Sequence, residues 1–203
     1  INEMSRGLPL LGEVIKYTLG RQSILSLGPT LVYCFWHSNQ DLRNNDLQIS
    51  FTPASYALGQ QAKLDPFPGF SIASWVQRPE SSGYVKIKSK DPFEKPIIQP
   101  NYLEATEDQR IQVEGIKISR KLMYNSYLAP YFDYEVYPGK GIVSDEELLQ
   151  VAKERSNTAY HLVGSCRMAP ETDKTSVVDS DLRVRGFENL RIVDASIMPM
   201  IPS

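Results

Sequence analysis

The spacing of apolar and polar positions predicts short strands in the first part of the chain. Residues 8–20 have helical spacing that ends at Gly20, which indicates a short helix. PTLVYCFWH (residues 29–37) and DLQISFTP (residues 46–53) are rich in β-branched and aromatic residues and are bounded by Asn, Asp and Pro, as strands are. Residues 52–69 carry prolines and glycines among few periodic apolar positions and are predicted to form a loop.

The middle of the chain changes from strand spacing to helical spacing. In SSGYVKIKSKDP, Val85 and Ile87 alternate with Tyr84, Lys86 and Lys88, which predicts a half-buried antiparallel strand. Further on, Thr106 is a candidate N-cap for a helix that reaches about residue 125, and Gly115 marks a point where a neighbouring element packs closely. Three apolar side chains share one face of that helix: Ile111, Ile118 and Leu122.

A second helix is predicted for DEELLQVAKERS, with Ser144 as its N-cap. Acidic residues at its start and Lys153 and Arg155 at its end complement the helix dipole. Because strands come mostly before helices, the order predicts an α+β fold, an antiparallel β-sheet backed by helices.

The closing segment predicts a hairpin-like pair of strands. LRV and LRIV repeat the same apolar–basic–apolar pattern eight residues apart, on either side of a turn at Gly186. Asp194 follows the second strand directly. An acid in the loop after a strand is a common place for ligand contacts in α/β architecture.

Composition excludes several classes of protein. The 203 residues carry a formal net charge of −2, which gives no electrostatic reason to expect nucleic acid or an anionic membrane as a partner. No apolar run approaches the roughly 20 residues of a membrane span, and two cysteines are too few for a disulfide framework. The sequence has no dinucleotide-binding glycine fingerprint, no Walker loop, no Gly-x-Ser-x-Gly and no His-Glu-x-x-His.

Chemistry concentrates in NTAYHLVGSCRM, which holds one of the two histidines and one of the two cysteines. A neutral imidazole suits His161 to accept a proton from a hydroxyl, but on spacing alone the favoured alternative is a half-buried histidine that bonds a backbone carbonyl. Cys166 is expected to pack as a small apolar side chain, and Arg167 to pair with a surface acid. A zinc site is the further alternative, with these four ligands: Cys34, His37, His161 and Cys166.

Several separated stretches resemble the glucose–methanol–choline (GMC) oxidoreductases. NTAYHLVGSCRM followed by VVDSDLRVRGFENLRIVDASIMPMIPS resembles the closing region of that family, and GYVKIKSKDPFEKPIIQPNYLEATEDQRIQVEGIKISRKL resembles its substrate-domain strand and helix. NDLQISFTP is similar to an earlier strand. The resemblance starts at about residue 46 and is strongest at residues 83–122 and 157–203.

The resemblance implies a substrate-binding domain over residues 1–176 and a return segment, residues 177–203, whose strands lead into an FAD-binding domain. FAD is the implied cofactor and a small-molecule alcohol the implied substrate; no metal is implied. His161 matches the histidine that faces the flavin, although Leu162 stands where the family often has Pro. The implied reaction is removal of the hydroxyl proton by His161 and hydride transfer to flavin N5.

The same resemblance suggests three cofactor-binding residues. Asp194 and Ala195 match a loop near the flavin, and Tyr160 would lie against the isoalloxazine. For Asp194 the alternative is a turn or helix cap, and for Tyr160 a core aromatic.

The chain ends suggest a fragment, whose partner would be the missing FAD-domain portion of the same enzyme. MPMIPS looks like the start of a helix with Ser203 as its N-cap, and the family's second active-site residue, Asn or His, would follow it. Other functions stay open: a lyase or photodecarboxylase on the same fold, or a non-catalytic module that docks a partner through VYCFWH. The choice between oxidase and dehydrogenase is also open.

Overall fold

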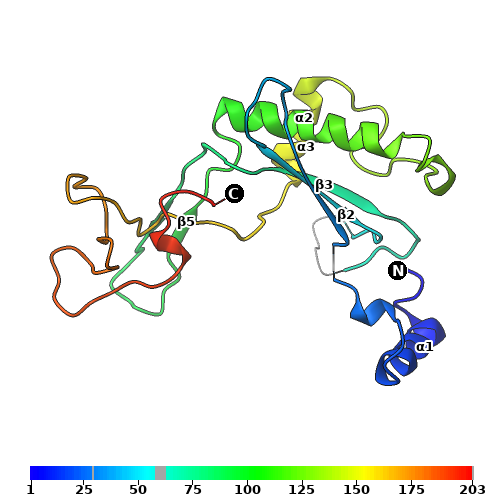
Figure 1. The fold of residues 1–203 in the computed structure, drawn as a ribbon, viewed down its shortest axis with the longest axis horizontal. Helices are drawn as coiled ribbons and strands as arrows, with labels where there is room; N and C mark the ends of the chain where they lie inside the picture. The colour runs from blue at the N-terminus through cyan, green and yellow to red at the C-terminus, as the bar shows by residue number, and fades with distance from the viewer. Residues whose placement is uncertain (29, 58–62, 203) are drawn as a thin grey trace. The chain divides into compact units, whose positions relative to one another are not determined.

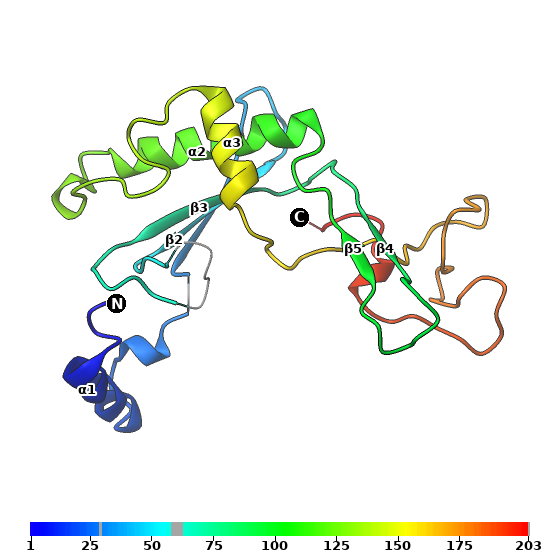
Figure 2. The same cartoon turned by 180° about the vertical axis from the view of Figure 1, so that it is seen from behind.

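The computed structural model of the chain describes residues 1–28, 30–57 and 63–202. Pro29, residues 58–62 and Ser203, on which parts of the predicted strand, loop and cap fall, lie outside the described residues. The elements, drawn in Figures 1 and 2, are α1 (Gly7–Thr18), η1 (Ile24–Ser26), β1 (Val32–Trp36), β2 (Leu47–Thr52), β3 (Ser71–Val76), β4 (Tyr84–Lys86), β5 (Ile97–Gln99), α2 (Thr106–Met123), η2 (Ala129–Tyr131), α3 (Asp145–Arg155) and η3 (Ala195–Ile197).

The chain separates into two compact units. The first consists of residues 1–76 and 110–157, and the second of residues 77–109 and 158–203. The predicted domain division at residue 176 refers to a whole enzyme and stays a prediction. None of the helices in the described part of the chain is long and apolar enough to cross a membrane.

The first unit is built on a three-stranded antiparallel sheet in the order β1-β2-β3. Leu47 and Ile49 of the central strand form the core with Ile111 of α2, and Leu47 is fully buried. Figure 1 shows α2 crossing the sheet. The predicted helix at residues 8–20, the two early strands and the antiparallel α+β class are therefore confirmed.

Gly115 is the point where α2 comes closest to the sheet. A Cβ atom placed there would lie 2.8 Å from Leu47 Cδ1 and 2.8 Å from Ser74 Oγ. Because neither side chain can withdraw freely from a packed interface, glycine permits the close approach that the sequence suggested. The predicted apolar face is confirmed at Ile111 and Ile118, while Leu122 is 43% exposed.

The ends of the helices follow local rules with one difference. Ser144 caps α3 through a complete capping box, because its hydroxyl accepts from Glu147 N–H and the Glu147 carboxylate accepts from Ser144 N–H. Thr106 is the first residue of α2, rather than a cap that precedes it.

Asp108 is buried and accepts hydrogen bonds from the backbone N–H groups of Glu80 and Ser81.

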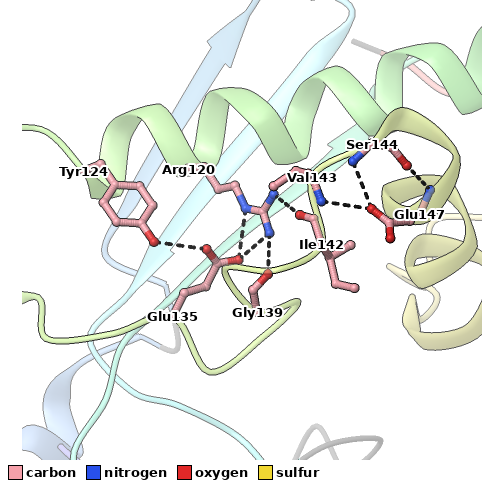
Figure 3. Close-up of polar contacts among 8 residues, drawn as sticks. All are labelled: Arg120, Tyr124, Glu135, Gly139, Ile142, Val143, Ser144 and Glu147. Atoms are coloured by element: carbon pink, nitrogen blue, oxygen red, sulfur yellow. Dashed lines mark hydrogen bonds and ion pairs between the residues drawn. The ribbon is translucent and has the colours of Figure 1, made fainter.

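A buried ion pair fastens α2 to the loop that leads into α3 (Figure 3). Arg120 donates from Nε and Nη2 to Glu135 Oε1, at 3.0 and 2.9 Å, and its guanidinium also donates to the carbonyls of Gly139 and Ile142. The Glu135 side chain is 2% exposed. Charge-assisted bonds of this kind satisfy a carboxylate whose burial would otherwise be costly.

The second unit begins with β4 and β5, which pair antiparallel with Val85 opposite Ile98. The predicted half-burial is wrong: all three residues of β4 are exposed, and Ile87 beyond it is 88% exposed. Alternation assigns side chains to two faces of a strand, but whether an element covers the apolar face is not a local property.

The closing segment forms a hairpin-like pair without regular strands. Arg183 and Arg191 form an isolated antiparallel bridge, flanked by a bond from Val184 N–H to the Leu190 carbonyl. Gly186 turns the chain with a φ of +78°. The predicted pairing and turn are therefore confirmed, and the predicted strands are replaced by isolated bridges around the fully buried Val178.

Candidate functional site

His161 lies in a stretch with two unusual backbone positions. Tyr160, directly before it, has a φ of +59°, and Gly164, three residues after it, has a φ of +87°. Glycine adopts such values freely, whereas a bulky aromatic residue rarely does. The chain therefore turns on both sides of His161.

Two backbone hydrogen bonds fasten the segment after His161 to the turn η3. Cys166 N–H donates to the Ser196 carbonyl at 3.0 Å, and Met168 N–H donates to the Ile197 carbonyl at 2.8 Å. A Cβ at Gly164 would lie 3.4 Å from the Met198 carbonyl oxygen, so the two segments run in close contact. Stretches that are thirty residues apart in sequence are thus held side by side.

These two segments line an open hollow of about 260 Å³. Its lining consists of Tyr160, His161, Leu162, Val163, Ala195, Met198, Ile201 and Pro202. The structure therefore brings together three of the four residues predicted for the site, namely Tyr160, His161 and Ala195. The walls are largely apolar, and His161 contributes an imidazole to them.

The His161 side chain is available at this hollow. It is exposed, and no hydrogen bond or ion pair reaches it from the residues that the structure describes. The alternative of a histidine held by a backbone carbonyl is therefore not what the described structure contains. Tyr160 is 75% exposed, so it is not a core aromatic in this chain.

Asp194 is the predicted residue that does not line the hollow. Its Oδ1 accepts from Ser196 N–H at 2.8 Å and caps η3. Hydrogen bonds from the Ser196 hydroxyl and then from Ser196 N–H lower the pKa of Asp194, which favours the carboxylate. The cap that the sequence offered as an alternative is thus present, and it fixes the turn that presents Ala195.

Five lining residues were not selected as site residues from the sequence: Leu162, Val163, Met198, Ile201 and Pro202. Apolar side chains at a chain turn carry no chemical signal of their own. The run MPMIP soon after Asp194 was the available clue, because a cluster of apolar residues outside any regular element often marks a binding surface.

The region behind the hollow is held by a charged turn. Arg167 donates to Asp173 Oδ2 at 2.9 Å, which confirms its predicted pairing with a surface acid. The Thr175 hydroxyl and backbone N–H, followed by Arg167, lower the pKa of Asp173 to about 2. The Arg167 carbonyl accepts from Val177 N–H at 3.1 Å, so this turn is continuous with the closing segment.

The residues proposed for zinc do not form a cluster in the described structure. Cys34 packs against the core of the first unit, and Cys166 is partly buried in the second. Within residues 1–28, 30–57 and 63–202, no group of three or more His, Cys, Asp or Glu side chains could hold a metal ion.

The hollow fits the edge of a flat aromatic cofactor such as a flavin. Its apolar walls and the glycine-permitted contact between the two segments suit close packing against a ring system. Tyr160, His161 and Ala195 are the residues of the predicted site that line this hollow.

Comparisons with known proteins show the family of the chain. Residues 79–203 match the sequence profile described as GMC oxidoreductase. The chain is 37% identical over 193 residues to an oxygen-dependent choline dehydrogenase of Staphylococcus xylosus, covering 95% of this chain and 34% of that protein. It is 36% identical over 186 residues to an alcohol dehydrogenase [acceptor] of Pseudomonas putida, covering 92% and 33%.

The fold is also similar to that of a solved flavoenzyme. A structure of Aspergillus oryzae RIB40 formate oxidase, from a study of its FAD modification, superposes with a TM-score of 0.79 at 23% identity, covering 98% of this chain and 40% of that one. The chain thus spans about a third of the length of the curated relatives it matches. With the profile match over more than half of its residues, the chain belongs to the GMC oxidoreductase family.

Proposed function

We propose that the chain is part of an FAD-dependent enzyme that oxidises an alcohol, with His161 as the group that accepts the hydroxyl proton. The observation that carries the proposal is the hollow lined by Tyr160, His161 and Ala195, in which the imidazole is exposed. FAD and a small-molecule alcohol are the proposed ligands. The curated relatives named above, a choline dehydrogenase and an alcohol dehydrogenase, support this class of reaction.

The proposed mechanism begins with a hydrogen bond from the substrate hydroxyl to an imidazole nitrogen of His161. As that nitrogen takes the proton, negative charge develops on the substrate oxygen and the adjacent C–H bond weakens. FAD, when bound, supplies the acceptor for the hydride. The protonated imidazole then stabilises neighbouring negative charge.

Other residues of the chain serve this step by shape. Leu162, Val163 and Met198 give the hollow apolar walls that limit water around the reacting hydroxyl. Asp194 holds the turn that presents Ala195, and we propose that both contact the cofactor through this turn. Tyr160 is proposed to lie against the flavin ring, because its side chain is exposed at the same hollow.

The test compares two histidine variants of a full-length enzyme that carries this chain. With His161→Gln, anaerobic reduction of the flavin by an alcohol should slow by about 10²–10⁴-fold, since the proton acceptor is lost. His37→Gln is the matched control, because His37 does not line the hollow, and it should leave the rate unchanged. Stopped-flow bleaching of the flavin measures both, with choline, aliphatic and aromatic alcohols as substrates.

Three results would contradict the proposal. Wild-type reduction by His161→Gln with its flavin bound would remove His161 from the proton transfer. Absence of bleaching with every alcohol class, in an enzyme that holds its flavin, would favour the lyase or photodecarboxylase alternatives. A full-length protein that binds no flavin would favour the alternative of a non-catalytic module.

A further inference from the structure

We infer that Thr158 and Tyr102 are positioning residues for His161, a role that rests on the proposed function. Neither side chain lines the hollow, so neither is a candidate for contact with the substrate. Their effect passes through the backbone of Tyr160, the residue that leads into His161.

The left-handed conformation of Tyr160 is the feature that needs support. An L residue with a bulky side chain is disfavoured at a φ of +59°, and such conformations persist where the surroundings enforce them. If Tyr160 relaxed to an extended conformation, the chain would enter His161 in a different direction. The orientation of the imidazole in the hollow therefore depends on whatever holds Tyr160.

The hydroxyl of Thr158 provides that support. Its Oγ1 accepts a hydrogen bond from Tyr160 N–H at 3.0 Å, a threonine turn that spans two residues. Within the described residues, this is the hydrogen bond that reaches positions 159–163. After them, the bond from Cys166 N–H to the Ser196 carbonyl fixes the chain again.

Tyr102 fixes the Thr158 oxygen from a distant part of the sequence. Its phenolic hydroxyl donates to Thr158 Oγ1 at 2.7 Å, across a separation of 56 residues. This bond uses the second lone pair of Thr158 Oγ1, so the oxygen that receives Tyr160 N–H is held in place. The bond from Tyr102 therefore adds a restraint on the threonine rotamer that receives Tyr160 N–H.

The loop that carries Tyr102 is itself anchored on both sides. Asn101 donates from Nδ2 to the Ser82 carbonyl at 3.0 Å, and the Leu103 carbonyl accepts from Gln109 Nε2 at 2.8 Å. Asn101 and Leu103 both have positive φ values, of +55° and +56°. A loop held so closely presents the Tyr102 hydroxyl at a defined point, as a positioning contact requires.

The experiment uses a full-length enzyme with its flavin and compares four single substitutions. Thr158→Val removes the hydroxyl at nearly constant shape, Thr158→Ser keeps the hydroxyl, and Tyr102→Phe removes only the phenolic oxygen. Tyr131→Phe is the matched control, because Tyr131 is 78% exposed and lies in the first unit. Anaerobic stopped-flow measurements give the flavin reduction rate at saturating alcohol and the alcohol's dissociation constant separately.

A positioning role predicts a loss of rate without a comparable loss of binding. In Thr158→Val, the rate of flavin reduction should fall at least about tenfold, because a catalytic group that points in the wrong direction loses rate steeply. The dissociation constant of the alcohol should stay within about threefold of the wild-type value. Thr158→Ser should restore the rate. Tyr102→Phe should slow reduction by about threefold and add little in the Thr158→Val background, because both changes break one chain of contacts.

Each contrary outcome has its own meaning. A wild-type rate for Thr158→Val, with His161→Gln slow, would overturn the positioning role and leave the proposed function standing. If His161→Gln is also unaffected, the proposed function fails with it. Should Thr158→Val not fold or not retain flavin, Tyr102→Phe decides alone, and a rate equal to that of Tyr131→Phe overturns the inference.

Discussion

The two units of the chain hold their residues in place by different means. In the first, β2 lies between two antiparallel neighbours, and Leu47, Ile49 and Ile111 form an apolar core. In the second, the segment around His161 has turns, isolated bridges and capped loops. The residues with a positive φ make the contrast plain: all five described non-glycine examples lie in the second unit.

This difference teaches where precision comes from in each unit. Packing and regular hydrogen bonding stabilise the first unit, so its weak points are cavities, overpacking and unpaired buried charge. In the second unit, individual hydrogen bonds hold an irregular backbone around His161, as is common at functional sites. Mutations should therefore affect global stability mainly in the first unit and local geometry mainly in the second.

The largest expected effect on stability comes from the ion pair shown in Figure 3. Arg120→Met should destabilise the first unit by about 3–5 kcal/mol, because the Glu135 carboxylate, 2% exposed, would stay buried without its partner. Hydrogen–deuterium exchange of the full-length enzyme should record the loss of protection in α2 and α3. The double change Arg120→Met with Glu135→Leu should recover much of it; equal protection in wild type and single variant would show that the pair contributes nothing.

A smaller effect is expected where α2 meets the sheet. Gly115→Ala should cost about 1–3 kcal/mol despite the higher helix propensity of alanine, because the new Cβ would overlap Leu47 and Ser74. Gly12→Ala is the matched control in α1, where nothing lies within 4 Å of the added atom, and it should stabilise by about 0.5–1 kcal/mol. Denaturation midpoints of the two variants should move in opposite directions; a shared direction would contradict close packing at Gly115.

The smallest effect is expected in the second unit and depends on pH. In the folded chain the pKa of Asp173 is about 2, below its usual value of 3.8. The ionised Asp173 therefore stabilises the turn above about pH 4, and this stabilisation is lost as the pH falls towards 2. In Asp173→Asn, the stability of the turn should not change with pH in this way. Limited pepsin digestion of the turn should be faster in the variant than in the wild type at pH 5, and the ratio should approach one near pH 2.5.

A ratio that stays constant over this range would show that the Asp173 charge does not hold the turn. If global unfolding also changed with pH in this range, Asp173 would contribute to global stability, and the contrast between the two units would not hold for this residue. The expected result is confined to the turn because Arg167 and Thr175 are its partners and both lie within it.

Local sequence rules predicted the first unit well and the second in part. The capping box of Ser144, the close approach at Gly115 and the early strands each depend on a few neighbouring residues, and each was found. The half-burial expected for the strand at Val85 was wrong, because burial of a face depends on a second element. Tyr160 gave no sign in the sequence of its left-handed backbone, which a glycine at that position would have suggested.

The sequence by itself determined the antiparallel α+β class, the capped start of α3 and the resemblance to the family, because spacing, capping residues and motifs can be read from short stretches of the chain. Only the tertiary structure decided that Tyr160, His161 and Ala195 share one hollow and that Thr158 meets Tyr102. Those contacts join segments that lie more than thirty residues apart in the chain. Their geometry is set by turns and single hydrogen bonds, which follow no period that a sequence pattern could display.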